Sequence, residues 1–377
     1  MKGIYIINSL EGGGAERVFS SLISLIQGDA NGDDIEVILI DDRKDIYSLP
    51  EHVIVHRIGE SNSFRSFMKY LSIVKEAKPD YVVSFLTRAN MYNVFGGFFA
   101  TYKALVSERS NTNGRLKGKF ATLQRLLVKF IYKRAALVIA VSQGVKDCLV
   151  DDFNIASNKI FILNNAIDVK AVQANVTGSA AVPYNKYIVA MGRLVRTKGF
   201  DTLIKAYALS KVRCDLRILG DGPEKEYLQG ICNELGVSDK VYFEGFRSNP
   251  YPYIAQSEFF VLPSQLEGFP NSLVEALSLG KAVLSTDCTD GPREILNLVA
   301  TIVPGDVHQA EFGALVNVSD EAGLAKGLSL LEDDLTLRSH YETLSFKCIE
   351  KYSPKNFYAN FQFILSKASQ KDFKNGF

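Results

Sequence analysis

The sequence has almost no excess of charge of either sign, and it has no long hydrophobic run. In 377 residues, 43 basic and 42 acidic side chains leave a net charge of +1, which excludes a protein that coats nucleic acid over its whole surface. The longest apolar runs, such as 94–100 and 135–141, span seven residues, far short of the roughly 20 needed to cross a bilayer. The N-terminal segment shows no small-residue cleavage site, so we expect no signal peptide.

The sequence is also poor in the patterns that bind metals or form disulfides. Its five cysteines, at 148, 214, 232, 288 and 348, are scattered and include no C-x-x-C, which is typical of reduced thiols in a cytosolic protein. No D-x-D occurs, so a metal-bridged diphosphate is not expected. His52 and His56 lie in a strand-like run and do not predict a metal site.

What is present is a repeated alternation of short apolar runs with helix-length segments. Continuously apolar strands are typical of a parallel sheet covered by helices on both faces, so the sequence predicts an α/β protein. The length exceeds that of one hydrophobic core and predicts two domains. In the first half we expect strands at 4–8, 35–40, 53–57, 81–85, 104–107, 137–141 and 160–163, with helices at 15–27, 64–75 and 120–133.

A polar, Gly- and Pro-containing stretch at 169–185 interrupts the pattern and reads as an interdomain linker. A second series of strands follows it, at 187–191, 216–219, 241–244, 259–262, 282–285 and 314–316. We therefore predict two Rossmann-like domains, 1–170 and 184–345. The tail at 354–377, with aromatic residues at 357, 358, 361 and 363, is expected to form a helix that docks back on the first domain.

Charge is unevenly distributed between the halves. Residues 1–170 carry 22 basic and 18 acidic residues, the remainder 21 and 24, and the segment 102–134 has nine basic residues against Glu108 alone. In its second half, Arg125, Lys129 and Lys133 form a stripe at helical spacing beside an apolar surface, much of which should pack inward. A solvated outer helix face explains this stripe too. Because basic amphipathic helices bind anionic lipid, we predict that Lys117, Lys119, Arg125 and Lys129 face a membrane.

Two loops that follow expected strands carry features suited to anions. Glu11-Gly-Gly-Gly-Ala-Glu-Arg17 opens a helix, where Gly13 and Gly14 would let a phosphate approach the free amides; a plain Gly-rich turn is equally open. Gly192-Arg-Leu-Val-Arg-Thr-Lys-Gly199 places Arg193 and Lys198 at the end of a strand, where ligands of open α/β sheets bind. Solvated loop cations are the alternative there.

Two further motifs lie in the second half. The segment LGDGPE at 219–224 suggests a structural turn, with Pro223 suited to the first position of a helix. The segment 264–280, SQLEGFPNSLVEALSLG, holds two carboxylates eight residues apart, Glu267 in a loop and Glu275 in a helix. Ser272 and Glu275 match a capping box, which would make Glu275 structural but leaves Glu267 unexplained. Alternatively, the two carboxylates bind hydroxyls of a nucleotide sugar while helix amides bind its phosphates.

Taken together and in this order, GGGAER, GRLVRTKG, LGDGPE, S-x-x-E-G-F and the pair of glutamates resemble a retaining glycosyltransferase of family 4. Members of that family have the GT-B fold, two Rossmann-like domains facing across a cleft, and the likeness covers nearly the whole chain. It implies an α/β enzyme that moves a sugar from a nucleotide diphosphate to a hydroxyl without a cofactor.

The resemblance also implies roles for individual residues. Glu267 matches the carboxylate that contacts the transferred sugar, and Arg193 and Lys198 match the diphosphate clamp; these three are the expected catalytic residues. The expected donor-binding residues are Glu275 at the ribose, Gly13 and Gly14 at the diphosphate, Phe246 and Arg247 at the nucleobase, and Asn271, Ser272 and Leu273 near the phosphates. Glu16 and Arg109 are expected to contact the acceptor or the sugar. Arg109 stands where many members carry a histidine, which places a proton relay there in doubt, and Ala166 replaces a glycine of the family.

The resemblance thus implies a hexosyl- or N-acetylhexosaminyltransferase, with a UDP-sugar donor and a glycan or lipid-linked acceptor of cell-surface polysaccharide or lipopolysaccharide synthesis. We expect it at the inner face of the cytoplasmic membrane, bound to anionic lipid and not to nucleic acid. A nucleotide-sugar epimerase of the same architecture and a non-catalytic nucleotide-binding subunit stay open as alternatives. A dehydrogenase is disfavoured because Arg17 interrupts G-x-G-x-x-G.

Overall fold

The chain folds into two compact units. The computed structural model describes residues 1–29, 32–110, 121–176 and 185–370. One unit consists of Met1–Ala166 together with Pro354–Phe377, and the other of Ile167–Ser353. The chain therefore leaves the first unit once and returns to it for its last helix. Each unit is described here by itself.

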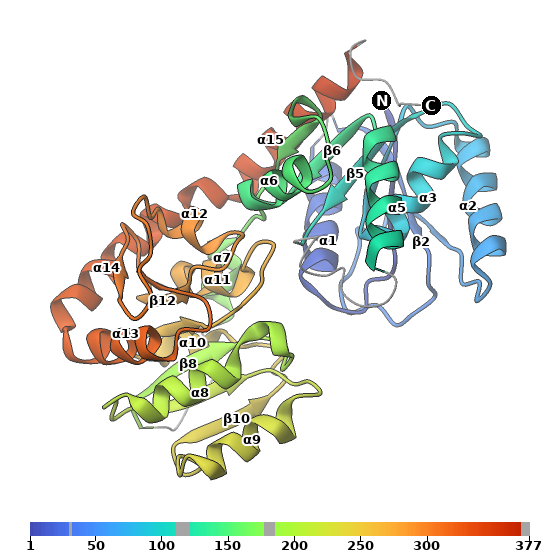
Figure 1. Ribbon diagram of the computed structural model, residues 1–377. Coiled ribbons are helices and arrows are strands. Elements are labelled where there is room, and N and C mark those ends of the chain that lie inside the picture. Colours follow the sequence, from blue (N-terminus) through green and yellow to red (C-terminus); the bar gives the residue numbers. More distant parts are fainter. Residues whose placement is uncertain (30–31, 111–120, 177–184, 371–377) are drawn as a thin grey trace. The chain divides into compact units, whose positions relative to one another are not determined.

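The first unit is a parallel sheet flanked by helices (Figure 1). Its sheet order is β3-β2-β1-β4-β5-β6-β7, and all of these neighbours pair in parallel. Its strands are β1 Lys2–Ile7, β2 Asp34–Leu39, β3 Ile54–Arg57, β4 Tyr81–Phe85, β5 Lys103–Glu108, β6 Leu137–Ala140 and β7 Ile160–Ile162. Its helices are α1 Gly14–Gln27, α2 Ser63–Ala77, α3 Thr87–Gly96, α5 Ala121–Arg134, α6 Gln143–Asp151, the 3-10 turn η1 Ser157–Lys159, and α15 Pro354–Ser369.

The central strands are buried along their whole length, as the apolar runs predict. Every residue of β4 and β6 is buried, because helices cover both faces of the sheet. Helix α15 completes the core of this unit: Phe357 and Phe361 are buried against it, and the Tyr358 hydroxyl donates a hydrogen bond to Asp29 over 3.0 Å. The α/β class is confirmed.

The second unit repeats this architecture. Its sheet order is β10-β9-β8-β11-β12-β14-β13, parallel except for the antiparallel pair β13 and β14. Its strands are β8 Tyr187–Met191, β9 Asp215–Leu219, β10 Val241–Gly245, β11 Phe260–Leu262, β12 Val283–Thr286, β13 His308–Gln309 and β14 Ala314–Val316. Its helices are α7 Val169–Ala174, η2 Arg196–Lys198, α8 Phe200–Leu209, α9 Lys225–Glu234, α10 Tyr251–Gln256, α11 Asn271–Ser278, α12 Pro292–Leu296, α13 Glu321–Asp333, α14 Leu335–Ile349 and η3 Glu350–Tyr352.

Two local predictions are wrong. The stretch 169–185 is not a linker throughout, because Asp168 caps helix α7 by accepting a hydrogen bond from the Ala171 N–H over 3.0 Å; residues 177–184 lie outside the described part of the chain. Helix α9 begins at Lys225, so Pro223 lies in the preceding turn and not at the first helical position.

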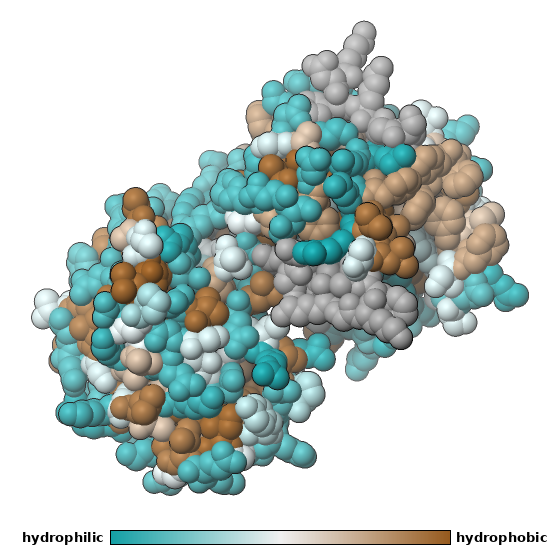
Figure 2. Space-filling view, viewed as in Figure 1, coloured by the Kyte–Doolittle hydropathy of each residue, from teal (hydrophilic) through white to brown (hydrophobic). Residues whose placement is uncertain are grey.

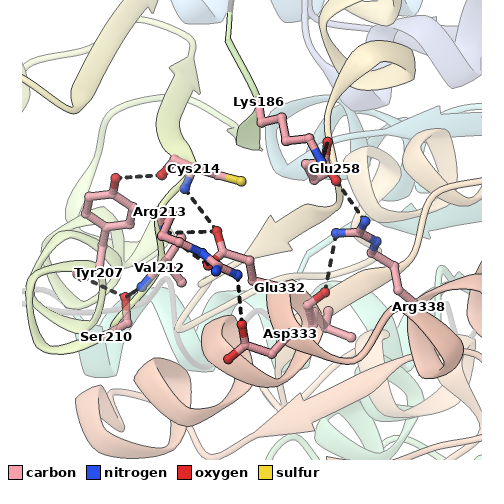
Figure 3. Close-up of polar contacts among 11 residues, drawn as sticks. Lys186, Tyr207, Ser210, Val212, Arg213, Cys214, Glu258, Glu332, Asp333 and Arg338 are labelled. Atoms are coloured by element: carbon pink, nitrogen blue, oxygen red, sulfur yellow. Dashed lines mark hydrogen bonds and ion pairs between the residues drawn. The ribbon is translucent and has the colours of Figure 1, made fainter.

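A buried carboxylate ties helix α13 to the start of β9 (Figure 3). Glu332, 8% exposed, accepts hydrogen bonds from the backbone N–H groups of Arg213 and Cys214, the shortest to each being 2.9 Å, and one from Arg213 Nε over 3.2 Å. Burial alone raises the pKa of Glu332, but the hydrogen bonds from Cys214 and Arg213 outweigh burial and lower this pKa below the usual value. The neighbouring Asp333 pairs with Arg213 at the surface, over 3.0 Å.

We predict that Glu332→Gln lowers the free energy of unfolding at neutral pH by about 1–3 kcal/mol, since charge-assisted hydrogen bonds to buried groups are weakened. Because the folded-state pKa is depressed, this stabilisation is present above the unfolded pKa and is lost as the pH falls through the folded value. Urea denaturation should therefore show the difference from wild type shrinking below about pH 4. Asp333→Asn is the matched control and should cost less than about 1 kcal/mol. A pH-independent difference would contradict this account.

Candidate active site

Polar residues of the second unit gather at the carboxyl edge of its sheet. Strand β8 lies between β9 and β11, so the connections that follow β8 and β11 run to opposite sides of the sheet. In open α/β sheets this switch point is where ligands bind. Residues 192–199 follow β8 and residues 263–270 follow β11, and they carry the GRLVRTKG and S-x-x-E-G-F motifs.

Glycines allow these loops to interlock. Gly199 has φ +65°, and a Cβ there would overlap the carbonyl oxygen of Pro263. The two loops are also joined by a hydrogen bond from the Gln265 N–H to the Thr197 carbonyl, over 2.8 Å. Gly220 and Gly222 allow the same close approach between the loop after β9 and the loop after β8. The motif glycines are therefore required by packing at the site itself.

The interlocked loops bring Lys198 and Glu267 together, although they are 69 residues apart. Lys198 Nζ lies 2.6 Å from Glu267 Oε1, and the Ser264 hydroxyl donates to the same oxygen over 2.6 Å. The side chains of Lys198 and Glu267 are 26% and 9% exposed. Glu267 Oε2 has no hydrogen-bond partner in the described part of the chain. One carboxylate oxygen is thus anchored, and the other can accept a hydrogen bond from a ligand hydroxyl.

The thiol of Cys288 is held in its protonated form. Burial raises the pKa of Cys288, and the negative charge of Glu267 raises it further, while the positive charge of Lys198 opposes the shift. A protonated thiol is a poor nucleophile and a poor metal ligand. Across the residues that the structure describes, no group of three or more His, Cys, Asp or Glu side chains is arranged to hold a metal ion.

Arg193 of the same loop remains available for a ligand. Its side chain is exposed and makes no ion pair within the described ranges. Together with Lys198, which has three donors and uses one on Glu267, it offers positive charge at the loop after β8. A diphosphate matches these donors in charge.

Glu275 is buried, 3% exposed, in helix α11. The capping-box explanation for it is wrong: α11 begins at Asn271 after Pro270, no side chain caps it, and Ser272 lies inside its first turn. Asn271, Ser272 and Leu273 form that first turn. Their role near a phosphate and the assignment of Glu275 to the ribose stay predictions.

The residues expected at the nucleobase follow β10. The Phe246 ring is 74% exposed. Arg247 pairs with Glu244 over 2.9 Å and lies over the Tyr253 ring, 5.2 Å from its centre. Strand β10 is separated from β11, which precedes the loop of Glu267, by β9 and β8.

In the first unit, the glycine loop opens helix α1, as predicted. Gly13 is the N-cap, with no side-chain hydrogen bond, and Gly14 is the first helical residue. The Glu16 carboxylate folds back against Gly13, where it would overlap any Cβ. A diphosphate could reach these amides only if Glu16 turned away, because both anions favour the helix N-terminus.

Arg109 lies at the carboxyl edge of the first sheet. It donates a hydrogen bond to the Asn165 side chain and lies 5.6 Å from the centre of the Phe85 ring. Its Nη1 is buried and has no hydrogen-bond partner among the residues that the structure describes. Burial lowers the pKa of Arg109 to about 10, although the negative charge of Glu108 opposes this, so the side chain is still cationic at neutral pH.

Sequence reasoning missed two residues of these sites. Ser264 shares the anchored oxygen of Glu267, and its position three residues before Glu267 in a loop was the available signal. Glu108 fixes the chain around Arg109: its Oε1 accepts from the N–H groups of Arg109 and Ser110, both over 3.2 Å, and its Oε2 accepts from Tyr132.

Of the predicted membrane-facing residues, Lys117 and Lys119 lie outside the described residues. Arg125 is exposed and Lys129 is half-buried on α5. Within the described ranges, no helix combines the length and the hydropathy needed to cross a bilayer.

Comparison with known proteins shows what class of protein carries this fold and site. The model of the family "Glycosyl transferases group 1" matches residues 178–343, and that of "Glycosyltransferase Family 4" matches residues 12–171. N-acetylgalactosamine-N,N'-diacetylbacillosaminyl-diphospho-undecaprenol 4-alpha-N-acetylgalactosaminyltransferase of Campylobacter jejuni is 33% identical over 353 residues, covering 90% of this chain and 92% of that protein. Lipopolysaccharide 1,6-galactosyltransferase of Escherichia coli is 28% identical over 48% of this chain and 51% of its own length.

Solved structures share the fold. HepE of Anabaena, in complex with UDP and glucose, has a TM-score of 0.79 at 17% identity, covering 97% of this chain and 100% of its own. The lipopolysaccharide outer core galactosyltransferase WaaB has a TM-score of 0.75 at 20% identity, covering 97% and 99%. The two α/β units thus have the GT-B fold of glycosyltransferases. The chain belongs to glycosyltransferase family 4, the group 1 glycosyl transferases.

We predict that Gly199→Ala abolishes nucleotide binding. The new Cβ would overlap the Pro263 carbonyl oxygen and force apart the loops that hold Lys198 and Glu267, and alanine at φ +65° adds a backbone penalty of about 1 kcal/mol. Gly230→Ala in helix α9 is the matched control, since its Cβ would meet nothing within 4 Å. Calorimetry with UDP should show loss of binding only for Gly199→Ala; unchanged affinity in that variant would contradict the interlocking of the two loops.

Proposed function

We propose that this glycosyltransferase moves a hexose or N-acetylhexosamine from a UDP-sugar to a hydroxyl of a glycan or lipid-linked acceptor, with retention of anomeric configuration. The observation that carries this proposal is the anchored pair of Lys198 and Glu267. It offers a cation for the diphosphate and an adjacent carboxylate oxygen for a sugar hydroxyl. A nucleotide sugar carries both groups.

In this proposal the second unit binds the donor. Lys198 and Arg193 balance the negative charge of the diphosphate, and the first turn of α11 supplies backbone N–H donors to its oxygens. Glu275 accepts hydrogen bonds from the ribose hydroxyls, and Phe246 and Arg247 border the nucleobase. In the first unit, Glu16 and Arg109 are proposed for the acceptor or the sugar, and the amides at Gly13 and Gly14 for a phosphate. The likeness to HepE, which was solved with UDP and glucose, supports a UDP donor.

The chemistry is a same-face displacement. The bond between the anomeric carbon and the β-phosphate oxygen breaks, the acceptor oxygen bonds to that carbon from the same side, and the acceptor proton passes to the leaving phosphate oxygen. UDP and the glycoside are the products. Lys198 and Arg193 stabilise the charge that develops on the leaving diphosphate, and the site gains rate from positioning. No metal is required in this account.

The acceptor is proposed to be lipid-linked and to serve cell-surface glycan synthesis. The Campylobacter relative is named for an acceptor on diphospho-undecaprenol and for transfer of N-acetylgalactosamine, and the Escherichia coli relative for lipopolysaccharide. Such an acceptor would place the enzyme at the inner face of the cytoplasmic membrane. The basic stripe of α5 supports contact with an anionic surface.

A panel of nucleotide sugars tests the proposal directly. Each donor is incubated with enzyme and a polyprenyl-diphosphate-linked sugar, in EDTA and with added Mg²⁺. Transfer from a UDP-sugar in both conditions, with the α-linkage of the donor retained in the product, is the expected result. Loss of transfer in EDTA would refute metal independence, and formation of an epimer from donor alone would favour the epimerase alternative.

The two carboxylates should respond differently to neutralisation. Glu275→Gln should weaken UDP binding about ten- to hundredfold, because one charge-assisted hydrogen bond to the ribose is lost. Glu267→Gln should leave UDP affinity within about twofold of wild type and depress transfer by a similar ten- to hundredfold. Thermal denaturation serves as the control for folding, with Glu275→Asp as a second variant if Glu275→Gln unfolds. Equal loss of UDP affinity in both variants would refute the assignment of roles.

A further inference from the structure

Large apolar side chains are exposed together on one surface of the first unit. Phe64 and Met68 of α2 are 72% and 48% exposed, Phe98 and Phe99 just after α3 are 44% and 58% exposed, and Leu123 and Leu126 of α5 are 66% and 60% exposed. These six residues are called the apolar face below. Figure 2 shows hydrophobic surface gathered over α2, α3 and α5, which are neighbours in the fold. Of the apolar surface expected beside the basic stripe, Ile131 packs inward as predicted, whereas Leu123 and Leu126 stay exposed.

The apolar face rests on a continuous layer of aromatic rings. The Phe99 ring lies 6.4 Å from Phe67 of α2, and the adjacent Phe98 ring lies 6.5 Å from Phe130 of α5, nearly parallel to it. Beneath them the Tyr70 and Tyr102 hydroxyls are hydrogen-bonded over 2.9 Å in the core. The exposed rings are therefore carried on packed helices, in fixed positions relative to one another.

The three segments that carry the apolar face are rich in positive charge. The segments 63–77, 87–100 and 121–134 contain eight basic residues and one acidic residue, Glu76. Two of the basic residues are neutralised, Lys69 by Glu60 over 2.6 Å and Arg88 by Asp41. The others make no ion pair within the described part of the chain, namely Arg65, Lys75, Arg125, Lys129, Lys133 and Arg134.

Exposed apolar side chains together with unpaired basic residues distinguish between two partners that could cover the apolar face, a second copy of the chain and an anionic bilayer. A second copy of the chain would bring two sets of like charges together, which is unfavourable. An anionic bilayer offers negative headgroups to the basic residues and a hydrocarbon boundary to the rings. Amphipathic surfaces of this kind bury their apolar residues about 5–10 Å into the headgroup region.

We propose that the apolar face inserts into an anionic lipid bilayer and holds the first unit on the membrane. This inference rests on the proposed function for the lipid-linked acceptor. It differs from a purely electrostatic contact of α5, because residues of α2, the turn after α3 and α5 all insert into the bilayer. Basic residues attract the protein to the surface, and the aromatic and leucine side chains then resist removal by salt.

The chain contains no tryptophan, so a single one can report on this surface without background. Phe99→Trp should shift its emission to shorter wavelength when vesicles of phosphatidylcholine and phosphatidylglycerol are added, and brominated lipids should quench it. Phe363→Trp is the matched control, because Phe363 is 55% exposed on α15, outside the apolar face, and should show neither change. No blue shift at low salt would overturn the proposal. A shift without vesicles that grows with protein concentration would assign the face to a second copy.

Removing the apolar side chains gives an independent test. Phe64→Ser, Phe99→Ser and Leu126→Ser combined should lower the vesicle partition coefficient at least about tenfold, whereas Ile54→Ser, Leu209→Ser and Phe363→Ser combined should change it by less than about twofold. UDP binding and donor hydrolysis are measured on the same proteins and should be unchanged in both. Equal partitioning of both triple variants with wild type would refute insertion. Absence of transfer from any donor, with insertion intact, would refute the proposed function alone.

Discussion

The ion pair between Lys198 and Glu267 is the contact on which the site depends. It joins residues from two different strand-to-helix connections, and it forms only because Gly199 lets the loop after β8 pack against the carbonyl of Pro263. A carboxylate that is 9% exposed requires a partner, since removing one member of such a pair leaves an uncompensated charge. Ser264 and Lys198 together fix one oxygen of Glu267 and leave the other for a ligand. Preorganisation of this kind is what the transfer of a sugar requires, because positioning and charge supply most of the rate.

Each unit places a cation near the carboxyl edge of its sheet, but the two cations differ in their partners. In the second unit Lys198 is paired with Glu267. Its ammonium group has further N–H donors for a diphosphate, so it could bind one and keep its contact with Glu267. In the first unit Arg109 lies at the end of β5, where it donates to Asn165 and lies over the Phe85 ring. Its buried Nη1 has no hydrogen-bond partner among the described residues, as is also true of Arg88 Nε and Arg134 Nε. A contact of Arg109 with the acceptor or the sugar stays a prediction.

Much of the fold and the position of the motif loops could be predicted from the sequence, because apolar runs and motif order are local signals. The strands at 81–85, 187–191 and 314–316 match the predicted ranges, and the other predicted strands differ by one or two residues at an end. The failures have physical reasons. Helix α7 depends on one side-chain cap from Asp168 in a polar stretch, and β13 is two residues long and pairs only with β14. The capping box at Ser272 failed because Pro270, earlier in the chain, already starts helix α11. The contact of Lys198 with Glu267 and the exposure of Leu123 depend on tertiary packing, which cannot be predicted from the spacing of residues along the chain.

The central claim is that Lys198 and Glu267 act as one unit in donor use. A double-mutant cycle on donor turnover measures this most directly, with Lys198→Met, Glu267→Gln and the combined variant compared at saturating acceptor. If the pair acts as a unit, the combined variant will be about as impaired as the worse single variant, because the second change removes an interaction that is already lost. If the loss of turnover in the combined variant equals the product of the losses in the two single variants, the two side chains act independently, which would contradict the account.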